Sequence, residues 1–417
     1  MGFPLVLFGL MCPIAGHAPI VAWQNPILKW SKLVKLEAPI VIIGSGLAGY
    51  TVIREIRKLN QEIPITLITR EPAYFYSKPM LSTAIAGRKE PMQLITGSRE
   101  DMAAQLGITI LAQTEVTAID IKNQIITSAQ GNISYTKLVL ALGADQIRLP
   151  LQGDAADQVI SVNDLEEYRS FRERITNKKR IAILGAGLIG TEFANDLIAG
   201  GYTVDVIDLA NQPLGRLLPP SAAAELKREL ANAGVSWHFE TTIETITHHQ
   251  DALLIQLKNG VQLVSDVVLS AVGLRPRTTL AKLAGLNTNQ GIQVNRRLET
   301  SAPQVYALGD CAEVDGLVLP YVMPLMQAAR ALAPNLLGEE VTVLYPAMPV
   351  MVKTPAMPIV VSPPAKDAVG MWESTAQEGG MKACFKSATG KLLGFALVGT
   401  ATTERASLAK LLPPVLI

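Results

Sequence analysis

Apolar residues along the chain form two patterns that alternate. Short, nearly continuous apolar runs predict buried strands, whereas apolar residues that recur every three or four positions predict helices. The runs Pro39–Ile43 and Arg180–Leu184 are each followed by a segment with helical spacing. These helical segments are Tyr50–Leu59 and Thr191–Ile198. Because strands alternating with helices favour parallel sheets, the predicted fold class is α/β.

A glycine-rich turn separates strand from helix at both places. The sequences are Gly-Ser-Gly-Leu-Ala-Gly and Gly-Ala-Gly-Leu-Ile-Gly, and their glycines are Gly44, Gly46, Gly49, Gly185, Gly187 and Gly190. In such a turn the first glycine allows the bend, the second lets a pyrophosphate approach the backbone, and the third lets helix pack on strand. One copy also occurs as a plain loop. Two copies about one domain apart favour two dinucleotide sites, and therefore two Rossmann-type three-layer domains.

A carboxylate follows the second predicted strand of each unit, where a ribose 2′-hydroxyl is bound in such folds. Asp208 follows Thr203–Ile207 at the expected spacing, and Glu71 follows Ile65–Thr69 at a longer spacing with Arg70 beside it. A carboxylate accepts from a free 2′-hydroxyl and repels a 2′-phosphate. Asp208 therefore predicts a preference for NADH over NADPH, which the nearby cation Arg216 could weaken.

Two further segments carry candidate chemistry. The apolar run from Val305 ends in Gly309-Asp310, which places a carboxylate at a strand's carboxyl edge, where ligands of α/β sheets bind. Asp310 either accepts hydrogen bonds from ligand hydroxyls or caps the next turn. The segment Tyr74–Ser82 combines aromatic residues with Lys78. It either packs on a planar ring and supplies positive charge, or is a surface loop with buried aromatics.

Composition narrows the class of protein. The 417 residues carry 37 basic and 36 acidic side chains, so there is no bulk positive charge of the kind that binds nucleic acid. The cysteines Cys12, Cys311 and Cys384 are far apart, which suits a reducing compartment, and we expect a cytoplasmic protein. The four histidines form no cluster at metal-ligand spacing, so no metal is predicted.

The predicted domains follow from where the strand and helix patterns change. Residues 38–148 with 268–338 form the first dinucleotide-binding domain, 149–267 the second, and 339–417, rich in proline and short strands, a small α+β domain. Residues 1–37 are expected to be a poorly ordered extension or an over-called start with Val34 near the natural beginning. Residues 1–28 have no Asp, Glu, Lys or Arg. Their prolines and the missing positive n-region disfavour a membrane anchor, which leaves a membrane or partner tether as the weaker alternative.

Taken together, these motifs resemble the two-dinucleotide flavoprotein reductases, and among them the rubredoxin reductases. The resemblance covers nearly everything from Pro39 onward, but not residues 1–37. It rests on the stretches Ile42–Tyr50, Tyr76–Ser82, Gly185–Leu197, Ala271–Arg277, Tyr306–Glu313 and Lys353–Ala356. The Ser-Lys-Pro loop and the Lys-Thr-Pro-Ala stretch are the narrower signatures.

The resemblance implies FAD on the first unit and NADH on the second. FAD would be held by Gly44, Gly46, Gly49, Glu71, Lys78, Gly143, Asp310 and Lys353, and NADH by Gly185, Gly187, Gly190 and Asp208. Lys78 would lie near flavin N5, paired with Glu192 from the second domain, and both are the expected catalytic residues. The alternatives are an exposed helix residue for Glu192 and a solvated edge-strand cation for Lys353.

The resemblance also implies how electrons leave the flavin. Disulfide reductases of this superfamily carry Cys-x4-Cys in the first helix and a His-Glu pair near the C-terminus. Here the first helix has no cysteine and residues 339–417 have no histidine, and Cys311 lacks a partner thiol and is expected to be packing. The expected activity is electron transfer from NADH through FAD to rubredoxin, in the service of alkane hydroxylation. Alternatives are a ferredoxin-type reductase of an oxygenase, an NADH oxidase, or a non-enzymatic flavin-binding protein whose redox state gates assembly.

Overall fold

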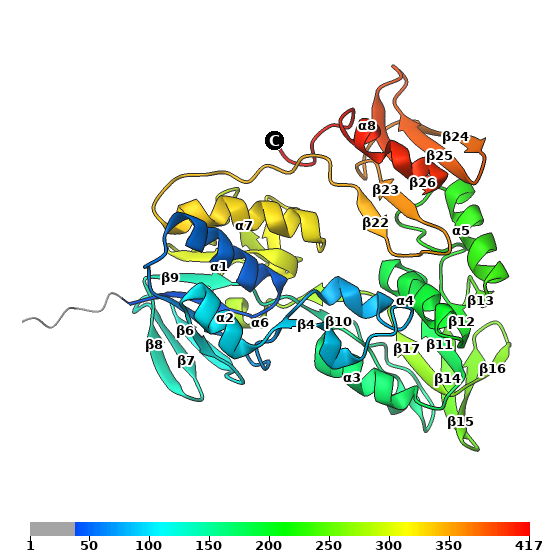
Figure 1. The fold of residues 1–417 in the computed structure, drawn as a ribbon, viewed down its shortest axis with the longest axis horizontal. Coiled ribbons are helices and arrows are strands. Elements are labelled where there is room, and N and C mark those ends of the chain that lie inside the picture. The colour runs from blue at the N-terminus through cyan, green and yellow to red at the C-terminus, as the bar shows by residue number, and fades with distance from the viewer. Residues whose placement is uncertain (1–37) are drawn as a thin grey trace, which may run out of the picture. The chain divides into compact units, whose positions relative to one another are not determined.

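The computed structural model describes residues 38–417. The expectations for residues 1–37, an extension or a tether, fall outside the described residues. Within 38–417 the predicted α/β architecture is confirmed, with two parallel sheets followed by an antiparallel one (Figure 1).

The first sheet has five parallel strands in the order β20-β9-β1-β2-β5. They are β1 (Ile40–Ile43), β2 (Ile65–Ile68), β5 (Thr109–Leu111), β9 (Lys137–Leu140) and β20 (Val305–Ala307). All residues of β1 and β2 are buried, as their continuous apolar runs predict for inner strands. The last strand in sequence, β20, joins this sheet after the chain has passed through the second sheet.

Two helices pack together beside this first sheet. They are α1 (Leu47–Leu59) and α7 (Val322–Leu336), which lie side by side in Figure 1. Both contribute to one apolar core through residues such as Ile53, Ile56 and Leu332. A further helix is α2 (Arg99–Leu106). Its N-cap residue is Ser98, whose side chain accepts from the Asp101 N–H at 3.1 Å. A meander of three antiparallel strands completes the unit: β6 (Val116–Asp120), β7 (Ile125–Ser128) and β8 (Gly131–Ser134).

The second sheet has four parallel strands in the order β13-β12-β11-β17. They are β11 (Arg180–Leu184), β12 (Thr203–Ile207), β13 (Val235–His238) and β17 (Val267–Ser270). The predicted domain boundary between residues 267 and 268 is wrong, because it cuts β17, which pairs with β11 along its whole length. The chain leaves this sheet only after Ser270. The rest of the predicted division into domains stays a proposal.

Helices α3 (Leu165–Arg174), α4 (Leu188–Ala199) and α5 (Pro220–Asn232) belong to the second unit. Every residue of α4 from Gly190 to Leu197 is buried, because α4 contacts both its own sheet and the 3₁₀ helix η1 (Lys78–Thr83) of the first unit. A second antiparallel meander lies beyond them, formed by β14 (Ile243–His249), β15 (Ala252–Leu257) and β16 (Gln262–Ser265). The two units thus share the same plan.

Short elements connect the units. The chain passes from the first unit to the second in β10 (Ala144–Gln146) and returns in β18 (Leu274–Pro276). These two short strands pair with each other in antiparallel orientation. The remaining short elements of the first unit are β3 (Phe75–Tyr76), β4 (Ile95–Gly97), α6 (Thr279–Leu283), β19 (Ile292–Val294) and β21 (Ala312–Val314).

The C-terminal segment forms a five-stranded antiparallel sheet in the order β22-β23-β26-β25-β24. Its elements are β22 (Val350–Val352), β23 (Ile359–Ser362), β24 (Met371–Gln377), β25 (Gly380–Lys386), β26 (Leu392–Gly399) and α8 (Arg405–Ala409). Helix α5 packs against β25 and β26 (Figure 1). Phe395 and Leu397 form a separate small core with Leu408 and Leu412. No helix between residues 38 and 417 is long and apolar enough to cross a membrane.

Candidate active site

The first glycine turn is shaped so that only its middle glycine faces open space. A Cβ atom on Gly44 would collide with the carbonyl oxygen of Ala141, and one on Gly49 would collide with the carbonyl oxygen of Gly44. A Cβ on Gly46 would meet no described atom within 4 Å. The outer glycines are therefore required by packing. The middle one leaves the backbone at the start of α1 accessible, as a pyrophosphate cradle requires.

The second turn repeats this geometry. Gly185 is blocked by the carbonyl of Ala271 and Gly190 by the carbonyl of Gly185, whereas a Cβ on Gly187 again meets nothing within 4 Å in the described part of the chain. Both turns fit a dinucleotide, since each presents an uncovered backbone at a helix N-terminus. The two cradles differ in the side chains that surround them.

Asp208 lies at the second cradle, where the sequence places it. Its carboxylate accepts hydrogen bonds from the Ala186 N–H within the turn and from the Ala210 N–H at 2.7 Å. These bonds hold the carboxylate at the mouth of the turn. Arg216 is exposed and forms no ion pair with any residue from 38 to 417. The arrangement leaves Asp208 as the charged group next to the turn.

We predict that Asp208→Ala lowers kcat/KM for NADH about tenfold and lowers it less for NADPH, because the lost carboxylate accepts from the 2′-hydroxyl and repels the 2′-phosphate. Steady-state rates with both nucleotides give the ratio. Asp251→Ala, an exposed aspartate in the same unit, is the control. An unchanged ratio in Asp208→Ala would rule out Asp208 as the ribose acid.

Glu71 lies beside the first cradle. Its backbone N–H donates to the Thr69 hydroxyl at 3.2 Å, and that hydroxyl also accepts from Ser45 of the turn at 3.0 Å. The Glu71 carboxylate is half-buried and has no hydrogen-bond or ion-pair partner within residues 38–417. The position is compatible with a ribose hydroxyl, and this role of Glu71 stays a prediction.

Asp310 and its neighbours lie close to the start of α1. Gly309 has φ of 77°, and a Cβ there would lie 2.9 Å from the Cβ of Ala48, so this turn needs glycine to approach the start of α1. The half-buried Asp310 carboxylate has no hydrogen-bond partner in the described chain. Burial raises the pKa of Asp310, and the charges of Lys78 and Arg277 oppose that rise. A carboxylate that feels the charge of two cations and is not hydrogen-bonded within residues 38–417 fits a polyhydroxyl ligand.

Arg277 also lies close to Gly143. Its guanidinium donates to the Leu142 carbonyl at 2.9 Å and to Asp145 at 2.6 Å, and it lies 3.8 Å from where a Cβ on Gly143 would be. Gly143 has φ of 73°, a conformation that favours glycine. The sequence motif contains Arg277, but nothing in the local pattern indicates that its charge acts on Asp310.

Lys78 lies at the start of η1. Its ammonium donates to the side-chain oxygen of Asn163 at 3.3 Å. The predicted pairing of Lys78 with Glu192 is wrong within the described chain, because Glu192 has other partners. Lys78 begins η1 and Ser82 lies near its end, and it is Ser82 that donates to Glu192 of α4.

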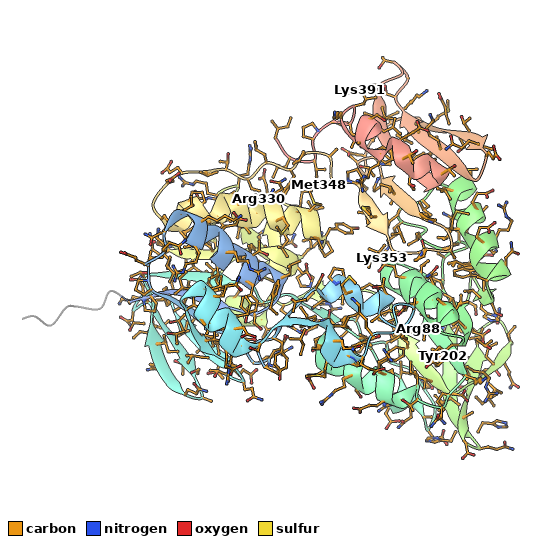
Figure 2. All side chains as sticks on the ribbon, viewed as in Figure 1. Arg88, Tyr202, Arg330, Met348, Lys353 and Lys391 are labelled. Atoms are coloured by element: carbon orange, nitrogen blue, oxygen red, sulfur yellow. The ribbon has the colours of Figure 1, made fainter. Side chains whose placement is uncertain are left out.

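Glu192 is buried, at 3 % exposed, and forms a junction of three chain segments. It accepts from the Ser82 hydroxyl at 2.7 Å and from the Lys353 backbone N–H at 3.0 Å, and it forms an ion pair with the Lys353 ammonium. The reading of Glu192 as an exposed helix residue is therefore wrong. So is that of Lys353 as a solvated edge-strand cation. Figure 2 shows Lys353 where the C-terminal segment passes beside α4.

The aromatic residues before Lys78 pack within the protein. Phe75 contacts Tyr50 edge to face at 5.4 Å between ring centres, and the Arg54 guanidinium lies 3.9 Å from the Phe75 ring centre. The Tyr76 hydroxyl accepts from the Leu165 N–H at 3.1 Å. Burial raises the pKa of Tyr76 and raises that of Tyr50 to about 12. These contacts favour the buried-aromatic alternative for Phe75 and Tyr76 over packing on a ligand ring.

Cys311 is buried in the first core. Its thiol lies 3.4 Å from the carbonyl oxygens of Leu140 and Leu308, and burial raises its pKa to about 11. A thiol with this pKa is protonated at neutral pH and is a poor nucleophile. The contacts agree with the expectation of a packing residue. No group of three or more His, Cys, Asp or Glu suited to a metal occurs among the described residues.

We predict that iodoacetamide at pH 8 leaves Cys311 unmodified in the native protein, because its raised pKa keeps it protonated and burial blocks access. Peptide mass spectrometry after labelling measures this. Labelling in denaturant is the control, since unfolding exposes the same thiol. Rapid native labelling of Cys311 would contradict the assignment.

Comparison with known proteins agrees with this geometry. Residues 38–333 match the family described as pyridine nucleotide-disulphide oxidoreductase, and residues 342–412 match the family described as rubredoxin binding C-terminal domain. A rubredoxin-NAD(+) reductase of Alcanivorax borkumensis is 48% identical over 91% of this chain and 99% of its own length. One of Acinetobacter baylyi is 48% identical over 90% and 98%.

A solved structure extends the comparison to the fold. A ferredoxin reductase of Rhodopseudomonas palustris superposes with a TM-score of 0.81 at 27% identity, covering 88% of this chain and 93% of that one. The chain belongs to the pyridine nucleotide-disulphide oxidoreductase family, and within it to the rubredoxin-NAD(+) reductases.

Proposed function

We propose that this protein oxidises NADH at a bound FAD and passes the electrons one at a time to rubredoxin. One observation carries the proposal. The segment that matches a rubredoxin-binding domain supplies Lys353 to the buried Glu192 of the second dinucleotide unit. The C-terminal segment, where rubredoxin is proposed to bind, is thus joined by an ion pair to the second dinucleotide unit, where NADH is proposed to bind.

The residues around the first cradle suit FAD. Gly44, Gly46 and Gly49 form the pyrophosphate cradle, Glu71 and Asp310 are acceptors for ribose and ribityl hydroxyls, and Gly143 lies beside Arg277. Lys353, also expected at FAD from the resemblance, pairs with Glu192 of α4. The chemistry that FAD supplies when bound is acceptance of a hydride from NADH and release of single electrons. The second cradle, with Gly185, Gly187, Gly190 and Asp208, suits NADH.

Lys78 and Glu192 have separate roles in this proposal. The Lys78 ammonium is held by Asn163, and its charge acts on Asp310, so it favours negative charge on the flavin side of the site. Glu192 keeps Lys353 in place and so joins α4 of the second dinucleotide unit to the C-terminal segment. Because Ser82 also donates to Glu192, the carboxylate is fixed from both neighbouring segments.

Acceptor specificity tests the proposal. The purified protein should be yellow, lose its colour on anaerobic addition of NADH, and support NADH-dependent reduction of rubredoxin faster than of a ferredoxin or oxygen. A colourless protein that takes up no FAD would overturn the whole scheme. Faster turnover with ferredoxin or oxygen would favour the ferredoxin-type reductase or oxidase alternative.

We further propose a cytoplasmic protein that serves alkane hydroxylation. The free thiols of Cys311 and Cys384 suit a reducing compartment, and the family resemblance supports the metabolic role. Growth of a deletion strain on alkanes and on acetate tests this. Equal growth of the mutant and its parent on alkanes would contradict the role.

A further inference from the structure

Asn163 holds the Lys78 ammonium through an amide that is itself fixed. Its side-chain N–H donates to the Ala144 carbonyl at 2.8 Å, and its backbone N–H donates to Glu167 at 2.7 Å. Asn163 is 6 % exposed. Lysine is only a donor and the Ala144 carbonyl is only an acceptor, so one amide oriented in this single way satisfies both. Leucine of similar size would satisfy neither.

The place of these contacts in the fold gives them a function. Ala144 begins β10, the strand that crosses between the two units, and it follows Gly143 directly. The positive charge of Lys78 also opposes the rise in pKa that burial causes at Asp310, which follows Gly309 near the start of α1, so Lys78 is close enough to this edge of the first cradle to interact with it electrostatically. Asn163 therefore links the crossing strand to the cation that borders this cradle.

We infer that Asn163 is a positioning residue that fixes the Lys78 ammonium beside the flavin site and so raises the flavin reduction potential. The inference rests on the proposed role of Lys78 at FAD. A lysine without this hydrogen bond would sample many rotamers, and water would screen its charge. A hydrogen-bonded ammonium keeps its charge at one position. Removing the amide should weaken the stabilisation of negative charge on the reduced flavin.

A double-mutant cycle tests this inference. The variants are Asn163→Leu, Lys78→Met and the double variant, and the readouts are the FAD midpoint potential by spectroelectrochemistry and the rate of FAD reduction by NADH. Asn163→Leu should make the potential more negative and slow reduction about tenfold. In the Lys78→Met background the same change should have no further effect. An equal effect in both backgrounds, or an unchanged potential, would overturn the inference.

Two further variants keep the test decisive. Asn335→Leu is the matched control, because Asn335 is also buried and bonds the backbone of Arg297 and Val341 away from Lys78. It should leave the potential unchanged, and a shift as large as that of Asn163→Leu would count against the inference. If Asn163→Leu loses FAD, Asn163→Ala serves in the same cycle. Rubredoxin takes no part in these measurements, so failure of the acceptor proposal is observed separately.

Discussion

Gly46→Val should yield a folded protein that no longer retains FAD. Gly46 has φ of −69°, which valine adopts readily, and its Cβ would meet no described atom within 4 Å. The new side chain therefore does not disturb the fold but fills the cradle that the pyrophosphate needs. We expect FAD content after purification to fall by about tenfold or more, a loss of at least about 1.4 kcal/mol in binding. The absorbance at 450 nm relative to 280 nm measures it.

Gly187→Val provides a matched control for this result. Gly187 has nearly the same backbone conformation, with φ of −72°, and the same open space beyond it. The variant should keep FAD, remain reducible by dithionite and lose rapid reduction by NADH. If Gly46→Val retains FAD, or if Gly187→Val is the variant that loses it, the assignment of the two cradles is wrong.

Lys353→Met should slow the reduction of FAD by NADH about thirtyfold and lower the melting temperature. The change leaves the buried Glu192 carboxylate without the cation that pairs with it, although Ser82 and the Lys353 backbone still donate. Breaking a buried ion pair by removing one partner is costly. We expect about 2 kcal/mol of that cost to raise the free-energy barrier for reduction of FAD by NADH. Stopped-flow reduction and thermal unfolding measure the two effects.

Lys391→Met is the control for Lys353→Met. Lys391 belongs to the same C-terminal segment but is exposed, and Figure 2 shows it far from Lys353. This variant should behave like the parent protein in both measurements. If the two variants slow reduction equally, the effect comes from the net charge of this segment and not from the junction with Glu192.

The fold could be predicted because its signals are local. Continuous apolar runs indicate the inner strands of parallel sheets, and each glycine turn lies between a run and a helical pattern. The structure shows why: Gly44 and Gly49 have no room for a side chain, whereas Gly46 leaves the backbone open. The sequence places the boundary at residue 267 wrongly, because the apolar run of β17 is equally compatible with the last strand of the second sheet and with a return to the first sheet.

The side-chain contacts of the site could not be predicted, since they depend on three-dimensional packing. The resemblance pairs Glu192 with Lys78, but the partners of Glu192 lie far apart in the sequence, Ser82 in η1 and Lys353 after β22. Asn163 precedes a helix cap, Asp164, and resembles an ordinary polar loop residue in sequence. Only the packing of η1 and α4 shows which of these groups meet.

Single-turnover reoxidation tests the central claim most directly. Protein reduced anaerobically with one equivalent of NADH is mixed in a stopped-flow instrument with oxidised rubredoxin, with an oxidised ferredoxin at the same concentration, or with oxygenated buffer. The predicted result is recovery of the flavin absorbance at least about tenfold faster with rubredoxin than with either alternative. Equal or faster recovery with ferredoxin or oxygen would contradict the proposed function.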